Sequence, residues 1–291
     1  MADQNSYPSQ QKKLVVPSDI PFFTILLVLS CLYIFLLIGI IVADFKYVDK
    51  ESIDRFFNDP NIMHSLKLSI FSCTVTTILC LIVAVPIGYL MSRFEFSGKA
   101  LLDTILDIPI MLPPLVIGIS LLIFFNTDMV NWLERFLQET FNNKSIKVNP
   151  TFTVMSVILA QFMVACAFAI RSMRTTFDEI NVRQEQVALT LGCSRGQAFW
   201  QIVLPKAKRG MVTAATLAWA RSLGEFGPIL IFAGTTRMKT EVLSTTVYLE
   251  FSVGNLAMAT TVSVFMILTA VFIMLIMRLY GNKNHLSGGK K

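Results

Sequence analysis

The apolar residues of this chain are gathered into six long blocks and do not alternate with polar residues. The blocks lie at about residues 21–43, 65–91, 101–125, 152–170, 211–233 and 256–277. A helix needs about 20 apolar residues to cross the hydrocarbon layer of a bilayer, and each block is near that length. The short alternating segments of a membrane β-barrel are absent from this pattern. The pattern therefore predicts an all-α membrane protein with six transmembrane helices, which satisfy their own backbone groups in lipid.

The polar segments between and around the blocks predict how the chain is organised. Both ends are polar and rich in Gly, Ser, Gln and Lys, which is typical of disordered tails. The first block is longer than the core of a signal peptide and leads into charged residues, so we expect a retained helix. The expected parts are a tail at 1–18, the first transmembrane helix with an external loop at 19–63, a five-helix core at 64–280 that includes a long polar loop at 171–210, and a tail at 281–291.

The composition agrees with a membrane protein and excludes several other classes. Of the 291 residues, 54% are hydrophobic and 15% are charged, whereas a soluble domain carries about 25% charged residues. A soluble enzyme, a nucleic-acid-binding domain and a disordered protein are therefore excluded, despite the net charge of +6. None of the five cysteines belongs to a C-x-x-C pair, and His64 is far from His285, so neither a metal site nor a structural disulfide is expected.

The lysines and arginines predict an orientation in the membrane. If the N-terminus is cytoplasmic, the inside segments hold most of these residues: Lys12, Lys13, Arg93, Lys99, Arg171, Arg174, Arg183, Arg195, Lys206, Lys208, Arg209, Arg278, Lys283, Lys290 and Lys291. The external segments hold fewer: Lys46, Lys50, Arg55, Lys67, Arg135, Lys144, Lys147, Arg237 and Lys239. The positive-inside rule then places both termini in the cytoplasm. The basic balance is explained by the anionic inner leaflet of the bilayer, and no nucleic-acid partner is expected.

The polar loop at 171–210 carries the signals of a short capped helix. Asn181 followed by Gln184 is typical of an N-cap with a returning side-chain amide. A helix is expected over residues 182–191. Gly192 follows directly and is placed to end this helix in a left-handed turn.

A second short helix is expected immediately after that turn. Ser194 and Gln197 have the spacing of a capping box, and Pro205 is expected just beyond the end of the helix. The loop is therefore predicted to form a rigid helix, a tight glycine turn and a second helix beneath the membrane.

This loop resembles the coupling loop of permease subunits of binding-protein-dependent ABC importers, type I. The family pattern reads E-A-A, three residues, G, nine residues, I-x-L-P. The positions that fit the spacing are Ala188, Gly192, Ile202, Leu204 and Pro205. Two positions depart from the pattern, since Gln186 stands in place of Glu and Val187 in place of the first Ala. Glu185 lies one residue earlier, where it could supply the charge.

The resemblance covers about residues 55–280 and implies the type I permease fold, with a docking role for the loop. In that family the two short helices fit a cleft on an ATP-hydrolysing subunit and transmit its movement to the spans. The coupling residues that it implies are Glu185, Gln186, Ala188, Leu191, Gly192, Ile202, Leu204 and Pro205.

Two opposite charges lie inside the fifth apolar block. Arg221 and Glu225 are four residues apart and therefore share one face of a helix. A charge inside a bilayer is costly unless it is paired or faces water. Two compatible interpretations follow: the side chains pair with each other, or they line the permeation path near its cytoplasmic end.

Prolines interrupt the third block at Pro109, Pro113 and Pro114. They break or kink a helix and free backbone carbonyls, either as a packing kink or in a broken helix that lines a transport path. The L-P-P-x-V-x-G string at 112–118 also resembles this permease family, which favours the path. The predicted path residues are Arg221, Ser222, Glu225, Pro113 and Pro114.

The segment A-R-S-L-G-E-F-G at 220–227 resembles permeases for molybdate, tungstate and sulfate. This likeness implies that an external binding protein delivers an oxyanion to the chain. Molybdate or tungstate is the favoured ion. Sulfate, iron or a polyamine carried by the same machinery is the alternative. An ATP-independent channel or secondary carrier is a weaker alternative, because Glu225 is the only acidic residue deep in a block and has a local partner.

The chain has no phosphate-binding loop of the form G-x-x-x-x-G-K-[ST], so it is not expected to be an ATPase or another enzyme. No cofactor is expected in this chain. The resemblance implies a prokaryotic plasma (inner) membrane location and three kinds of partner: two copies of an ABC nucleotide-binding subunit that hold ATP and Mg, an external substrate-binding protein, and a second permease chain. One coupling loop and no internal repeat make a homodimer the simplest arrangement.

Overall fold

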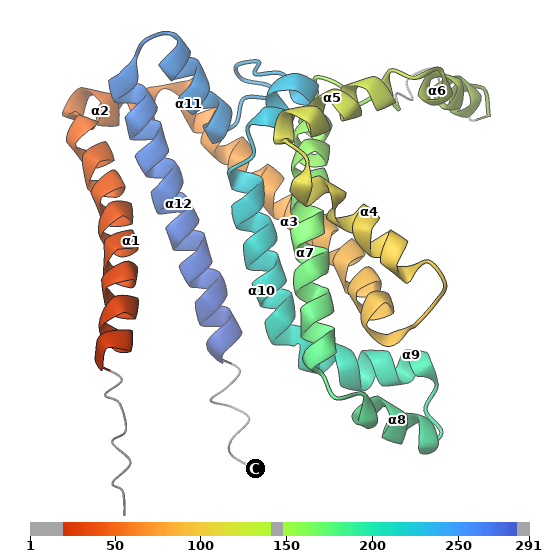
Figure 1. Cartoon of the computed structure of the whole chain (residues 1–291). Helices are drawn as coiled ribbons and strands as arrows, with labels where there is room; N and C mark the ends of the chain where they lie inside the picture. Colours follow the sequence, from red (N-terminus) through yellow and green to blue (C-terminus); the bar gives the residue numbers. More distant parts are fainter. Residues whose placement is uncertain (1–19, 141–147, 284–291) are drawn as a thin grey trace, which may run out of the picture. The chain divides into compact units, whose positions relative to one another are not determined.

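The computed structural model describes residues 20–140 and 148–283, which form helices and no strands (Figure 1). The elements are α1 (Ile20–Tyr47), α2 (Lys50–Asn58), α3 (Pro60–Arg93), α4 (Lys99–Met111), α5 (Pro114–Phe125), α6 (Asp128–Thr140), α7 (Val154–Glu179), α8 (Val182–Thr190), α9 (Arg195–Ala198), the π-helical η1 (Phe199–Val203), α10 (Leu204–Leu223), the π-helical η2 (Ile229–Ala233), α11 (Leu243–Ser252) and α12 (Leu256–Lys283). The all-α prediction is confirmed. The expected tails at 1–18 and 281–291 fall wholly or largely outside the described residues.

The chain forms two compact units, which divide between Lys46 and Tyr47. The first unit contains α1, a 28-residue helix that is apolar along its length. The second unit contains the other helices and the whole of the predicted coupling loop.

The prediction of six transmembrane helices is not confirmed. Within the described residues, four helices are long and apolar enough to cross a membrane: Phe22–Tyr47, Pro60–Arg93, Val154–Glu179 and Leu256–Leu279. The helices α4 and α5 bring the number to five if they count as one span bent by 109°. The bend falls at Leu112 and Pro113, because Pro113 and Pro114 cannot continue the hydrogen bonds of α4.

The fifth predicted span, residues 211–233, is also broken. Helix α10 ends at Leu223, and residues 224–228 separate it from η2. This stretch reads Gly-Glu-Phe-Gly-Pro, and glycine and proline both weaken a helix interior. The two breaks therefore have the same kind of cause.

Three helices form the centre of the second unit. Helix α3 packs against α7, and α10 packs against both (Figure 1). Small residues allow this close approach, since a Cβ atom on Gly88 of α3 would lie 2.9 Å from Cβ of Met173 on α7. Membrane helices commonly associate through such small residues.

A buried glutamine joins the same three helices by hydrogen bonds. Gln161 on α7 accepts from Thr76 Oγ1 of α3 at 3.2 Å. Its amide nitrogen donates to the carbonyl oxygen of Ser222 on α10 at 3.3 Å. Because these groups are away from water, the bonds hold the three helices in one register.

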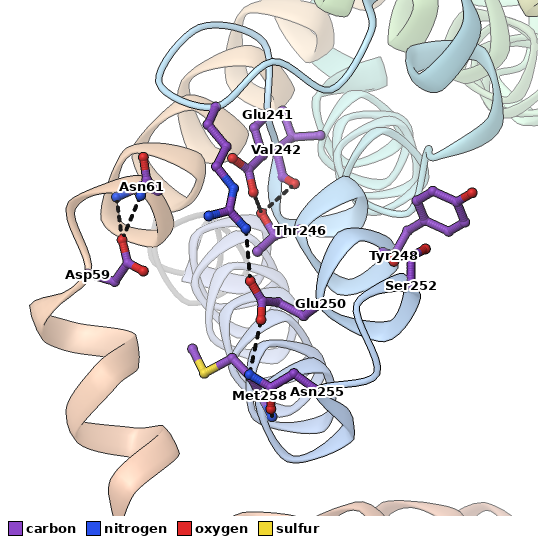
Figure 2. Close-up of polar contacts among 11 residues, drawn as sticks. Asp59, Asn61, Glu241, Val242, Thr246, Tyr248, Glu250, Ser252, Asn255 and Met258 are labelled. Carbon is purple, nitrogen blue, oxygen red and sulfur yellow. Dashed lines mark hydrogen bonds and ion pairs between the residues drawn. The ribbon is translucent and has the colours of Figure 1, made fainter.

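A polar network lies around α11, at the end of the unit opposite α8 and α9 (Figures 1 and 2). Arg237 contacts Glu250 at 3.3 Å, and Asn255 donates to the other carboxylate oxygen of Glu250 at 3.2 Å. Thr246 donates to Glu241 at 2.9 Å. Burial raises the pKa of Glu241, although the Thr246 hydrogen bond opposes this shift. The network fixes the turn between α11 and α12.

Candidate functional site: the coupling loop and the two broken helices

The first coupling helix, α8, begins as the sequence predicts but is capped in a simpler way. The side chain of Asn181 accepts a hydrogen bond from the backbone N–H of Arg183 at 2.9 Å. Gln184 does not return to the cap, because its side-chain oxygen accepts a hydrogen bond from Lys206. The expected returning amide was therefore wrong, and Gln184 instead ties α8 to the start of α10.

Gly192 ends α8 in a left-handed turn, and this prediction is confirmed. Its φ is +91°, a conformation that other residues rarely adopt. The N–H of Gly192 donates to Leu189 O at 3.1 Å, and the N–H of Cys193 donates to Ala188 O at 3.0 Å. These two bonds are those of a Schellman motif. The turn is thus fixed by backbone hydrogen bonds.

The capping box of the second coupling helix is also confirmed. Gln197 N donates to Ser194 Oγ at 3.3 Å, and Ser194 N donates to the Gln197 side chain at 2.8 Å. The helix does not stop before Pro205, however, because α9, η1 and α10 follow without a break. The wider turn of η1, in which Leu204 N donates to Phe199 O, accommodates the proline in the first turn of α10. The second coupling helix is therefore continuous with a long core helix.

A buried cluster attaches α8 to the end of α3. The side chain of Glu185 accepts a hydrogen bond from the Tyr89 hydroxyl and forms an ion pair with Arg93, with Nε and Oε2 3.3 Å apart. Arg93 also donates to the carbonyl oxygen of Ile180 at 2.8 Å. The Glu185 carboxylate thus holds the loop against its own chain, while Gln186 beside it is exposed.

Sequence reasoning did not identify Tyr89 or Arg93 as parts of this site. They lie about ninety residues before Glu185, so no local pattern joins them. Their spacing of four residues places both on one face of α3. This spacing was the only available signal.

The outer surface of the loop is apolar. The most exposed large side chains are Leu191 at 80%, Trp200 at 68% and Val187 at 56%. Among the other predicted coupling residues, Ala188 is buried, Ile202 and Leu204 are half-buried, and Pro205 is exposed. An exposed apolar group on a rigid, capped element is typical of a surface that docks a partner. Trp200 was missed by the sequence reasoning.

The structure brings Arg221 and Glu225 together as an ion pair, as one interpretation of the sequence expected. Arg221 also lies over the ring of Phe168, 5.6 Å from its centroid. Ser222 is fully buried, and its hydroxyl donates to Ala218 O at 2.8 Å. The lining of a path by these three residues stays a prediction.

The two broken helices meet at their breaks. A Cβ atom on Gly118 of α5 would lie 2.8 Å from Cα of Pro228, and one on Gly227 would lie 3.2 Å from the backbone nitrogen of Leu115. The chain after Pro113 and Pro114 thus packs backbone to backbone against the interrupted end of α10. Such discontinuous helices supply free backbone groups at a transport path.

The functional groups of the site lie in two structural features, the capped loop and the helix breaks. No group of three or more His, Cys, Asp or Glu residues that could hold a metal ion occurs in the part of the chain that the structure describes. The site consists of a capped loop with an exposed apolar surface and a pair of helix breaks.

These features are typical of the membrane component of a transporter. Comparison of the sequence with known protein families identifies which family it belongs to. Residues 84–284 match the model of the binding-protein-dependent transport system inner membrane component. The chain belongs to this family, the permease component of ABC importers, whose ATPase is on a partner subunit.

Relatives in this family are named as permeases for different oxyanions. The chain is 32% identical over 205 residues to a molybdate/tungstate transport system permease protein of Pyrococcus abyssi, which covers 70% of this chain and 74% of the relative. It is 28% identical over 237 residues to a sulfate transport system permease protein of Escherichia coli, which covers 79% and 82% of the two chains.

Solved structures support the fold alone. A chain of a bacterial alginate ABC transporter, solved with a periplasmic protein that carries an alginate pentasaccharide, has a TM-score of 0.72 and 16% identity, over 91% of this chain and 95% of that chain. A chain of the MetNI methionine ABC transporter has a TM-score of 0.55 and 14% identity, over 79% and 97%. The family match, together with the helices of the described residues, identifies the protein as a multi-pass ABC importer permease.

Proposed function

We propose that this chain forms the translocation path of an ATP-driven importer for an inorganic oxyanion, with molybdate or tungstate as the transported ion. The observation that carries this proposal is the likeness to molybdate/tungstate permeases over about two thirds of the chain, together with the A-R-S-L-G-E-F-G segment. Sulfate is the second candidate, because the sulfate permease relative covers a larger share of the chain.

The proposed assembly contains two copies of this chain, two ABC nucleotide-binding subunits that hold ATP and Mg, and an external substrate-binding protein. The exposed Leu191, Trp200 and Val187 would enter the cleft of a nucleotide-binding subunit. In this arrangement α8, α9 and both termini face the cytoplasm of a prokaryotic cell, and the chain lies in its plasma membrane.

The test of the substrate uses the complex reconstituted in vesicles with its own ATPase and binding protein. We expect ATP-dependent uptake of labelled molybdate and tungstate, and faster ATP hydrolysis when either ion is present. Uptake of sulfate alone would select the second candidate. Uptake of any ion by the permease without the ATPase would contradict the ATP-driven machine altogether.

The test of coupling replaces Gly192 with alanine. A non-glycine residue at a left-handed position costs about 1–2 kcal/mol, and the new Cβ would contact nothing within 4 Å. We expect fewer ions transported per ATP hydrolysed and unchanged membrane insertion, and Gly192→Pro should uncouple the two activities more strongly.

Gly196→Ala is the matched control for this test, because Gly196 has an ordinary helical conformation and equally open surroundings. Equal transport per ATP in wild type, Gly192→Ala and Gly192→Pro would show that the glycine turn does not couple the two activities.

A further inference from the structure

A hollow of about 730 Å³ lies between α7 and α10, next to the coupling loop. Its basic lining residues are Arg171, Lys206 and Arg209, and its one acidic lining residue is Glu179. The remaining lining is formed by hydroxyl-bearing and apolar side chains. The hollow therefore carries an excess of positive charge.

The helix repeat brings these cations together. Arg171 and Thr175 lie on one face of α7, while Lys206, Arg209 and Thr213 lie on one face of α10. The two faces approach closely beside the hollow. A Cβ atom on Gly210 would lie only 2.0 Å from Oγ1 of Thr176, so the glycine is needed for this approach.

The two arginines of the hollow are available for a ligand. Within residues 20–140 and 148–283, neither Arg171 nor Arg209 forms a hydrogen bond or ion pair through its guanidinium group, and both are exposed. Nearby Arg174, in contrast, is paired with Asp103. Lys206 contacts Gln184 of α8. The guanidinium groups are therefore the strongest free donors in the hollow.

Three of the hydroxyl groups in the hollow have a different role. Thr175, Thr176 and Thr213 donate to carbonyl oxygens of their own helices. The hydrogens of these three threonines are therefore not directed at a ligand, and the cationic groups supply most of the donors in the hollow. Two planar guanidinium forks suit a tetrahedral oxyanion better than they suit a monovalent halide, because each fork can donate two parallel hydrogen bonds.

We propose that this hollow is an anion site on the coupling-loop side of the permease, where Arg171 and Arg209 hold a tetrahedral oxyanion. The proposal rests on the proposed function, and it adds an anion site that lies apart from the predicted path residues. Two sources share this chemistry: the transported oxyanion itself and the phosphate group of an anionic lipid. Contact between Lys206 and Gln184 places the site next to α8, so movement of the loop would alter it.

The test measures binding to the complete permease–ATPase complex in nanodiscs, without ATP and without the binding protein. Labelled molybdate is the probe in discs of phosphatidylcholine. We expect saturable binding that weakens at least about tenfold in the double variant Arg171→Gln/Arg209→Gln. The matched control is Lys208→Gln/Arg278→Gln, which removes the same charge from exposed positions outside the hollow and should bind as wild type does.

A second arm identifies the source of the anion. In discs that contain phosphatidylglycerol, lipid retained by the complex is measured by native mass spectrometry. If the double variant loses molybdate binding and the control variant keeps it, the ligand of the hollow is the transported ion. If wild type binds no molybdate, and only the double variant loses its retained phosphatidylglycerol, the ligand of the hollow is the lipid phosphate.

The site would be overturned if wild type, the double variant and the control variant bound molybdate and phosphatidylglycerol equally. It would also be overturned if the double variant and the control variant lost binding to the same extent. Failure of the proposed function gives a different result. The wild-type complex would then bind molybdate at the hollow without ATP-driven uptake, whereas normal uptake with no binding at the hollow would overturn only the site.

Discussion

At the scale of single residues, the attachment of α8 depends on one carboxylate. The side chains of Glu185 and Arg93 are 11% and 6% exposed, so their ion pair is largely removed from water. Tyr89 adds a hydrogen bond to the same carboxylate. Removal of one member of such a cluster leaves the other groups buried and incompletely paired.

We expect Glu185→Gln to lower the free energy of unfolding by about 1–3 kcal/mol, because Arg93 then lacks its counter-charge. In the reconstituted complex, transport should fall more than ATP hydrolysis, since α8 is less firmly attached to α3. Thermal unfolding in detergent and the ratio of ions transported to ATP hydrolysed check the two effects. Glu95→Gln is the control, because Glu95 makes the same kind of ion pair with 87% of its side chain exposed.

An unchanged melting temperature and transport ratio in Glu185→Gln would mean that the cluster does not hold the loop. Only Glu185 of this cluster could be predicted from the sequence. The caps at Gly192 and Ser194 follow from local rules, since each depends on residues within a few positions. The partners of Glu185 depend on how α3 and α8 meet in space, which no local pattern encodes.

At the scale of elements, the main result is that two helices stop within the membrane-spanning part of the chain and pack against each other at their breaks. The break at Pro113 was expected from the prolines. The break after Leu223 was missed, because the apolar character of residues 211–233 concealed the signal of Gly224, Gly227 and Pro228. Hydropathy reports whether a segment is apolar, and it does not report whether the helix is continuous.

We expect Gly118→Ala to destabilise the protein by about 1–3 kcal/mol, as overpacking of a tight contact usually does. The new methyl group would meet the backbone of Pro228, which cannot move aside as a side chain could. The melting temperature and the uptake rate should both fall. Gly39→Ala in α1 is the control, since its Cβ would contact nothing within 4 Å, and equal stability of the two variants would contradict the close contact.

At the scale of the whole molecule, the orientation of the chain follows from charge rather than from packing. The basic residues predicted to lie inside include those near α8, α9 and the start of α10, while α11 lies at the other end of the second unit (Figure 1). The sequence alone therefore predicts which end faces the cytoplasm, because the positive-inside rule needs no tertiary structure.

We expect a membrane-impermeant maleimide to label native Cys193 in inverted membrane vesicles and not in intact spheroplasts, because the positive-inside rule predicts that the Gly192 turn faces the cytoplasm. Cys193 is partly exposed, and the other four cysteines lie in predicted spans. Ser252→Cys, at the exposed end of α11, should show the reverse pattern. Labelling of Cys193 in intact spheroplasts would invert the topology.

The continuous helix formed by α9, η1 and α10 also restricts where residues can be inserted into or deleted from this chain. Each residue of an α-helix turns the chain by about 100°. One residue inserted between Ala198 and Leu204 would therefore rotate Arg221 away from Phe168 unless a wider turn absorbed it. An insertion at the Gly192 turn would leave the angular position of α10 unchanged. Very little natural length variation is therefore expected between α9 and the end of α10.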